Sequence, residues 1–369
     1  MPTERAPPII DFSCTSTIYS SLTLRTFCSP QLTSLLQAFY GEDPTAKQSL
    51  IQQVRSACET FGFFQIINHR IPESLQQDIL KQSEQFFELP LEIKEKYNKG
   101  KLFHLTGFNR GYERLRAQNF EKKAEGDLKE GYYFGTHLAL DHPYVVRRKI
   151  NLGPNKYPED VADPKGFKMT ADSYFKAVEK LAHDILKVLA ATLGLDENFF
   201  QDYIDTPIAI LRLLHYPPQP ADASPDERGI GAHTDFGGIT ILLQDMIGGL
   251  QVWNRDNSTW VDVKPLEGAL VVNLGNMMMR WTNDRYVSNL HRVINKTGQE
   301  RYSVPFFFSG NPEFVVKCLP SCEDVKNGAK YPPVSVEEWI TGRYADTYGA
   351  ADDKKAIKDL SAHASNAYA

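Results

Sequence analysis

Apolar positions along this chain change their spacing about halfway. In the first half they recur three to four positions apart, which predicts helices over about 46–61, 73–88 and 168–193. The longest of these carries one continuous apolar stripe, and Gly194 is placed to cap its end. From about 208 to 316, short apolar runs alternate with Gly, Asn and Pro, which indicates strands separated by turns.

Seven strands are expected in this second region. They follow one another too closely for the crossover helices of parallel βαβ units. The expected strands cover 208–215, 238–243, 250–253, 260–263, 269–274, 288–294 and 303–308. Their number and spacing predict an all-β barrel or a jelly roll.

The flanking regions complete the expected organisation. Further strands are expected at 8–12 and 63–67, a short charged helix at 91–97 and a C-terminal helix at 335–348. The predicted parts are a helix-rich N-terminal region contributing to a substrate pocket (1–150), a linker and support helix (151–205), a jelly-roll core (206–316) and a C-terminal helix with a tail (317–369).

Glycine and aromatic residues interleave at 107–112 and 129–135. One interpretation is a flexible wall that offers aromatic surface to an apolar ligand. The other is a pair of surface loops whose aromatic side chains fill small satellite cores. Nearby Arg110, Arg114 and Arg116 are interpreted as solvated charges, with contacts to an anionic ligand as the alternative.

Composition and charge argue against nucleic-acid and membrane partners. The net charge is -5 and Lys and Arg are scattered, so nothing indicates a nucleic-acid partner. No run of about 18 apolar residues is present, so neither a membrane span nor a membrane partner is expected. The start of the chain lacks a signal core and the five cysteines follow no pattern, which is typical of a cytoplasmic protein. A small-molecule partner and a monomer or weak homodimer are expected.

Candidate chemistry lies in the strand-rich half. His233 and Asp235 form the only His-x-Asp pair, although the chain has nine His residues. Alternate residues of a strand face the same side, about 6 to 7 Å apart, so this imidazole and carboxylate can share one metal ion. Gly237 and Gly238 give the chain room to turn beside them. Alone, the pair fits a structural hydrogen-bonded His–Asp pair equally well.

Two downstream features favour a metal site. His291 lies on an expected strand among small and apolar residues, where an imidazole needs a partner. Two His and one carboxylate are the ligands of many non-haem Fe(II) oxygenases, although zinc hydrolases use the same atoms. Arg301 and Ser303 share the face of the next strand. A guanidinium that points into a barrel needs an anion, and its planar fork suits a carboxylate.

In this order and spacing, the motifs resemble those of the Fe(II)- and 2-oxoglutarate-dependent oxygenases of the isopenicillin N synthase-like branch. Residues 9–12 are similar to the opening strand of that family, and residues 55–72 are similar to its N-terminal signature. His233-x-Asp235, His291 and Arg301-x-Ser303 match its metal and cosubstrate motifs. The resemblance implies an α+β fold with a double-stranded β-helix (jelly-roll) core, flanking helices and a helix-rich N-terminal region.

The resemblance also implies roles for single residues. Fe(II) would be bound by His233, Asp235 and His291, and the distal carboxylate of 2-oxoglutarate by Arg301 and Ser303. Tyr216 matches a tyrosine that assists this binding, although an Asn common in the family two positions earlier is Leu214 here.

Substrate contacts are implied at two further positions. Phe307 matches a position that often stacks on the substrate, and Phe134 is similar to a position in the pocket wall. Core packing explains a phenylalanine at either position equally well. His69, inside the N-terminal signature, is expected to be structural.

The implied activity is a coupled oxidation. Oxidative decarboxylation of 2-oxoglutarate would drive hydroxylation, desaturation or ring modification of a small, largely apolar or aromatic metabolite in specialised metabolism. O₂ is the other cosubstrate, and ascorbate is a further reductant. Two alternatives keep the same scaffold: an enzyme whose Arg301 holds a substrate carboxylate without 2-oxoglutarate, and a catalytically silent small-molecule receptor. A zinc hydrolase is disfavoured because no general base is evident near the metal motif.

Overall fold

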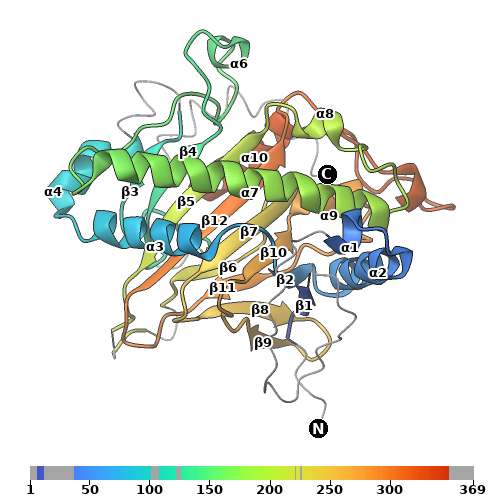
Figure 1. Cartoon of the computed structure of the whole chain (residues 1–369), viewed down its shortest axis with the longest axis horizontal. Coiled ribbons are helices and arrows are strands. Elements are labelled where there is room, and N and C mark those ends of the chain that lie inside the picture. The colour runs from blue at the N-terminus through green and yellow to red at the C-terminus, as the bar shows by residue number, and fades with distance from the viewer. Residues whose placement is uncertain are drawn as a thin grey trace.

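Two β-sheets form the core of the molecule and helices cover the larger of them (Figure 1). The computed structural model describes residues 6–11, 37–100, 108–121, 126–220, 222–224 and 227–348. The tail predicted at the end of the region 317–369 lies outside these ranges. Within them, every helix is too short or too polar to cross a bilayer.

The larger sheet has eight strands in the order β1-β2-β10-β7-β12-β5-β4-β3. Only the β1–β2 pair is parallel. The strands are β1 (Ile9–Asp11), β2 (Phe63–Ile67), β3 (Gly111–Glu113), β4 (Glu130–Gly135), β5 (Ile208–Tyr216), β7 (Ile239–Gln244), β10 (Leu270–Leu274) and β12 (Arg301–Gly310). Strands from both ends of the chain therefore complete one sheet.

The smaller sheet has four antiparallel strands in the order β6-β11-β8-β9. They are β6 (Ile230–His233), β8 (Leu250–Asn254), β9 (Thr259–Asp262) and β11 (His291–Val293). A separate two-stranded ribbon joins β13 (Val315–Val316) to β14 (Val334–Ser335). The predicted α+β jelly-roll core is confirmed by this architecture and by its solved relatives, which are described below.

The helices are mostly those that the apolar spacing predicts. They are α1 (Gln37–Tyr40), α2 (Pro44–Thr60), α3 (Glu73–Phe87), α4 (Leu91–Lys94), α6 (Pro143–Val146), α7 (Pro164–Thr192), α8 (Gln201–Ile204), α9 (Asn276–Trp281) and α10 (Val336–Tyr348), with 3₁₀ turns at Glu95–Tyr97 and Pro320–Cys322. The short helix α9 and strand β6 were not among the predicted elements.

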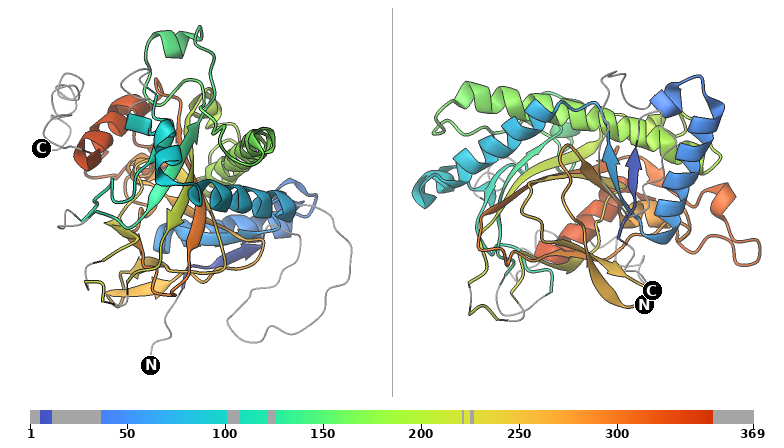
Figure 2. Two further views of the ribbon diagram at one scale, coloured as in Figure 1. Left: turned by 90° about the vertical axis from the view of Figure 1, so that its left-hand side faces the viewer. Right: turned by 60° about the horizontal axis from the view of Figure 1, so that its bottom comes forward.

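Helix α7 runs across the outer face of the larger sheet, with α2 and α3 beside it (Figure 1). Asp163 caps its first turn by accepting from the Gly166 N–H, and Pro164 fits the first helical position. At its other end Gly194 adopts a φ of 70°, as its predicted capping role requires. Helix α10 lies on the opposite side of the sheets (Figure 2).

The two glycine–aromatic stretches contain strands β3 and β4, so the interpretation as surface loops is wrong. Tyr112 and Tyr132 are buried in the main core, around Phe86 of α3. The glycines have a packing reason: a Cβ on Gly135 would lie 2.3 Å from the Arg110 guanidinium. Arg110 is itself buried and donates to carbonyl oxygens, so its interpretation as a solvated charge is wrong.

Candidate active site

Strand pairing in the smaller sheet brings the predicted metal ligands together. His233 is the last residue of β6 and lies directly opposite His291, the first residue of β11. Their ring centroids are 4.2 Å apart. Asp235 follows β6 in a turn, and its Oδ1 atom lies 3.8 Å from His233 Nε2 and 3.7 Å from His291 Nε2. These three atoms are close enough to coordinate one ion.

Hydrogen bonds orient all three side chains toward a common point. The Nδ1 atoms of His233 and His291 face the carbonyl oxygens of Gly231 (2.8 Å) and Asn289 (3.2 Å), which places each ring proton on Nδ1. The Nε2 lone pairs are then available to a metal. Asp235 Oδ2 accepts from Thr240 and Asn273, both at 2.6 Å, so Oδ1 is the oxygen that remains for coordination.

The environment keeps His233 neutral and the carboxylate of Asp235 charged. Burial and the neighbouring His291 lower the pKa of His233 to about 3, against the opposite pull of Asp235. The pKa of Asp235 is lowered, because the two histidines and its two hydrogen-bond donors outweigh its burial. Neutral imidazoles and an ionised carboxylate are the forms that bind a metal cation.

The turn after β6 leaves no space for side chains on its glycines. A Cβ on Gly238 would lie 2.4 Å from the Tyr203 hydroxyl oxygen, and one on Gly237 would lie 2.6 Å from Ser309 Oγ. The carbonyl of Asp235 accepts from the Asn276 N–H at 2.8 Å, which attaches the turn to the start of α9. The glycines therefore permit close packing around the metal ligands.

A segment from the N-terminal half supports the free edge of β6. Asp127 accepts from the Gly231 N–H at 3.0 Å, and Glu121 accepts from the Ala232 N–H at 2.9 Å. The Phe120 ring stacks on the His233 ring at 4.4 Å between centroids. Sequence reasoning missed these residues because no motif connects them to a histidine more than a hundred positions away.

Arg301 is fully buried at one end of the same site. Its Nε donates to the Gly248 carbonyl at 2.5 Å and one Nη to Gln244 Oε1 at 3.3 Å, while the other Nη has no partner among the described residues. No carboxylate in the described ranges lies within ion-pair distance of it. The neighbouring Glu300 points outward and contacts His215 instead.

Tyr216 and Ser303 lie beside this arginine. Tyr216 is directly opposite Arg301 in the β5–β12 ladder, and its ring centroid is 4.7 Å from the guanidinium carbon. Burial raises the pKa of Tyr216, against the opposite effect of the nearby Arg301 and Ser303. Leu214, which replaces the Asn of the family pattern, also faces this end. The three predicted cosubstrate residues are therefore adjacent.

One cavity contains the predicted metal ligands and Arg301, and its empty space is about 1030 Å³ including open solvent at its mouth. It lies between the sheets, and its walls follow the two-residue period of the strands. The lining residues of β5 are Ile208, Ile210, Arg212, Leu214 and Tyr216, and those of β12 are Arg301, Ser303, Pro305, Phe307 and Ser309. The side chains between them point to the α7 face, where Leu211, Phe306 and Phe308 are buried.

The two predicted substrate contacts have different positions. Phe307 lines the cavity. Phe134 does not, and its expected place in the pocket wall is wrong: it packs on Tyr157 and Phe167 beneath α7. In the β4–β5 ladder Phe134 pairs with core-facing Leu211, whereas Tyr133 pairs with cavity-facing Arg212. A step of one residue along a strand changes the face.

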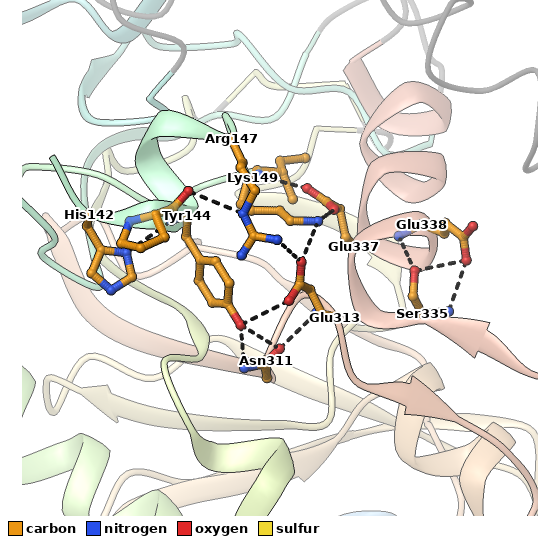
Figure 3. A network of polar contacts seen from close by, with 11 residues as sticks. His142, Tyr144, Arg147, Lys149, Asn311, Glu313, Ser335, Glu337 and Glu338 are labelled. Carbon is orange, nitrogen blue, oxygen red and sulfur yellow. Dashed lines mark hydrogen bonds and ion pairs between the residues drawn. The ribbon is translucent and has the colours of Figure 1, made fainter. Parts of the chain in front are cut away.

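Helix α10 closes one side of the cavity with Ile340 and Tyr344. The Trp339 indole N–H donates to the Phe236 carbonyl at 2.8 Å, next to the metal ligand Asp235. Glu337 pairs with Lys149 at 2.7 Å and accepts from the Ile150 N–H, so α10 is joined to the segment after α6 (Figure 3). The helix predicted at 335–348 is therefore present, and it lies against the cavity.

Two family models match the chain. The N-terminal domain model of the non-haem dioxygenase in morphine synthesis covers residues 33–160, and that of the 2OG-Fe(II) oxygenase superfamily covers residues 207–310. The 2-oxoglutarate-Fe(II) type oxidoreductase hxnY of Emericella nidulans is 48% identical over 351 residues, which are 95% of this chain and 93% of that protein. The 2-oxoglutarate-dependent dioxygenase citB of Monascus ruber is 38% identical over 315 residues, covering 84% and 93%.

A solved structure agrees with these matches. A full-length Neurospora crassa protein, in complex with alpha-KG and thymine, superposes with a TM-score of 0.73 at 28% identity, covering 92% of this chain and 96% of that one. Because relatives this similar span nearly the whole chain, the resemblance inferred from the motifs is confirmed. This protein belongs to the 2OG-Fe(II) oxygenase superfamily and is an oxidoreductase that uses Fe(II) and 2-oxoglutarate.

Proposed function

We propose that His233, Asp235 and His291 bind the Fe(II) ion, and that Arg301, Ser303 and Tyr216 bind the distal carboxylate of 2-oxoglutarate. One observation carries this assignment: a single cavity holds the His–Asp–His cluster and a buried guanidinium with one Nη that has no partner among the described residues. A buried arginine without a carboxylate nearby is costly, and a bound dicarboxylate removes that cost.

The residues fit these groups chemically. Two neutral imidazoles and a carboxylate suit Fe(II) and leave positions for further ligands. When bound, Fe(II) and 2-oxoglutarate supply the oxidising chemistry: O₂ is reduced, 2-oxoglutarate becomes succinate and CO₂, and a substrate C–H bond is oxidised. The chain fixes the ligand atoms through Thr240 and Asn273. It also surrounds the site with apolar side chains that exclude water.

The substrate is a small molecule bound at the end of the cavity away from Arg301. That end is lined by Ile208, Ile210, Phe307, Ile340 and Tyr344. The Neurospora crassa structure with thymine shows that a relative of this architecture holds a single-ring compound together with alpha-KG. Several curated relatives are fungal 2-oxoglutarate-dependent dioxygenases, and another is named clavatol oxidase, which supports an oxidation in specialised metabolism.

The test is a stoichiometric binding experiment. Calorimetry under nitrogen should show one 2-oxoglutarate bound per chain in the presence of Fe(II), and binding at least tenfold weaker after the metal is chelated. Admission of O₂ should then yield succinate. Binding without O₂ uptake would indicate the receptor alternative, and O₂ uptake without succinate would indicate an enzyme that uses Arg301 for a substrate carboxylate.

A further inference from the structure

The cavity contains a second arginine, Arg212, that the metal and cosubstrate assignments do not use. It lies on the cavity face of β5, four residues before Tyr216, or about 13 Å along the strand. Its guanidinium carbon lies over the ring of Phe307, six residues beyond Arg301 on β12. The guanidinium of Arg301 instead contacts Gly248, Gln244 and Tyr216. The two cations therefore serve different ends of the cavity.

Two aromatic rings hold the Arg212 guanidinium between them. The guanidinium carbon is 4.5 Å from the Tyr133 ring centroid and 4.7 Å from that of Phe307. Tyr133 is fixed in turn, because its hydroxyl donates to Glu113 and the Lys99 ammonium lies over its ring. Stacked rings cover the faces of a guanidinium but leave its N–H groups, which lie in its plane, able to donate.

The described charged residues near this arginine include more cations than carboxylates. Glu113 pairs with Lys99 at 2.5 Å and with Lys129 at 3.6 Å, and it also lies in the field of Arg212. Asp127 is a second carboxylate acting on Lys129, so among these described residues two carboxylates stand beside three cations. Among the described residues that line the cavity, Asp235 is the only acid, and it is committed to the metal site. This end of the cavity favours an anion.

The surroundings of Arg212 restrict what that anion can be. Ile208, Ile210, Phe307 and Ile340 provide an apolar wall, which suits a flat hydrocarbon or aromatic body. A planar fork presents two parallel N–H groups, which match the two oxygens of a carboxylate. A phosphate dianion would require more donors than one arginine in an apolar wall supplies.

We propose that Arg212 binds a carboxylate of the substrate, so that the substrate class is small aromatic or otherwise apolar carboxylic acids. This inference rests on the proposed function, since it places the acid beside the metal site and beyond the bound 2-oxoglutarate. Arg212 then determines specificity: it fixes one end of the substrate, and the apolar wall directs the rest toward the metal ligands.

The test compares acids with their neutral amides. Fe(II)-loaded protein under nitrogen, saturated with 2-oxoglutarate so that Arg301 is occupied, is titrated calorimetrically with benzoate, phenylacetate and 3-phenylpropanoate, each paired with its amide. At least one acid should bind about 10-fold or more tightly than its amide. Arg212→Gln should remove that preference by weakening the acid about 10- to 100-fold, and Arg212→Lys should restore part of it.

Control variants separate this inference from the proposed function. Arg147→Gln removes an exposed cation that does not line the cavity and should leave the preference unchanged. Arg212→Gln should keep 2-oxoglutarate binding while losing the acid preference, whereas Arg301→Gln should lose 2-oxoglutarate binding. A wild-type protein that prefers none of the acids would overturn the inference, as would a preference that survives Arg212→Gln. Failure of 2-oxoglutarate to bind the wild type would contradict the proposed function instead.

Discussion

The two carboxylate oxygens of Asp235 have different roles: one accepts hydrogen bonds and the other is left for metal coordination. Oδ2 is fixed by Thr240 and Asn273, so Oδ1 is presented to the metal in one orientation. Outer hydrogen bonds of this kind commonly change metal affinity by about 10- to 100-fold.

We therefore expect Thr240→Val to weaken Fe(II) binding by at least about 10-fold without preventing folding. Competition with a chromophoric chelator under nitrogen measures this affinity. Thr297→Val, on an exposed turn, is the matched control and should bind Fe(II) as the wild type does. Equal affinities in the two variants would show that the Thr240 hydroxyl does not orient the ligand.

Replacement of Arg301 should weaken the binding of 2-oxoglutarate and leave the binding of Fe(II) unchanged. Arg301→Gln removes a desolvated cation, and loss of such a partner costs about 2 to 5 kcal/mol. The Kd for 2-oxoglutarate, measured calorimetrically with Fe(II) under nitrogen, should rise at least about 30-fold while Fe(II) affinity is unchanged. Glu300→Gln changes the adjacent, outward-facing residue and should have little effect. An unaltered Kd in Arg301→Gln would place the 2-oxoglutarate carboxylate elsewhere.

Single residues also show what the sequence could predict. The proposed metal ligands and Arg301 could be selected from the sequence because their chemistry demands fixed residue types in a fixed order. Phe134 was misplaced, since composition alone does not give the phase of a strand, and a step of one residue changes its face. Arg212 could have been selected from the sequence. It lies four residues before Tyr216 in β5, and residues separated by an even number of positions in a strand face the same side.

Strands β4 and β5 are joined to α4 by a buried ionic cluster. Glu130 accepts from the Lys94 ammonium, the Tyr112 hydroxyl (2.6 Å) and His215 Nδ1 (2.8 Å). Burial raises the pKa of Glu130, but the hydrogen bonds from His215, Tyr112 and Lys94 outweigh it, so the pKa lies below its ordinary value of 4.5. The charged form is therefore favoured by folding.

The sign of the pH dependence follows from this lowered pKa. The contribution of Glu130 is fully present above pH 4.5 and is lost as the pH falls through the folded value. Urea unfolding at pH 7 should show Glu130→Gln less stable by about 3 kcal/mol, with the gap to the wild type narrowing below pH 4.5. Glu197→Gln, which breaks an exposed pair with Lys47, should cost under about 1 kcal/mol. A difference in unfolding free energy between the wild type and Glu130→Gln that grows below pH 4.5 would contradict this explanation.

At the scale of elements, helices were easier to predict than strands. The stripe on α7 is 29 residues long and repeats one signal many times, whereas β11 has three residues and β6 four. Strands β3 and β4 were not predicted, because glycine in a sequence normally indicates a turn. Here Gly135 makes space for the side chain of Arg110, a reason that exists only after folding.

The whole molecule should be stabilised by its ligands, because the site lies between the two sheets. Fe(II) and 2-oxoglutarate bind only the folded chain, so each at about 100 times its Kd adds about 2.7 kcal/mol. The Tm, followed by circular dichroism, should rise in two steps, first with Fe(II) and then with 2-oxoglutarate. In Arg301→Gln the second step should be missing, and its persistence would show that 2-oxoglutarate does not need Arg301.

The hydrogen bonds of Asp235 have a mechanical consequence. His233 and His291 belong to the smaller sheet, whereas Thr240 and Asn273, which hold Asp235, lie on β7 and β10 of the larger one. A bound ion would therefore connect the two sheets. Chelation should accelerate amide hydrogen exchange in β6 and β11, while β5 and β12, secured beneath α7, keep their protection. The metal that enables the chemistry would thus also limit how far the two sheets can separate.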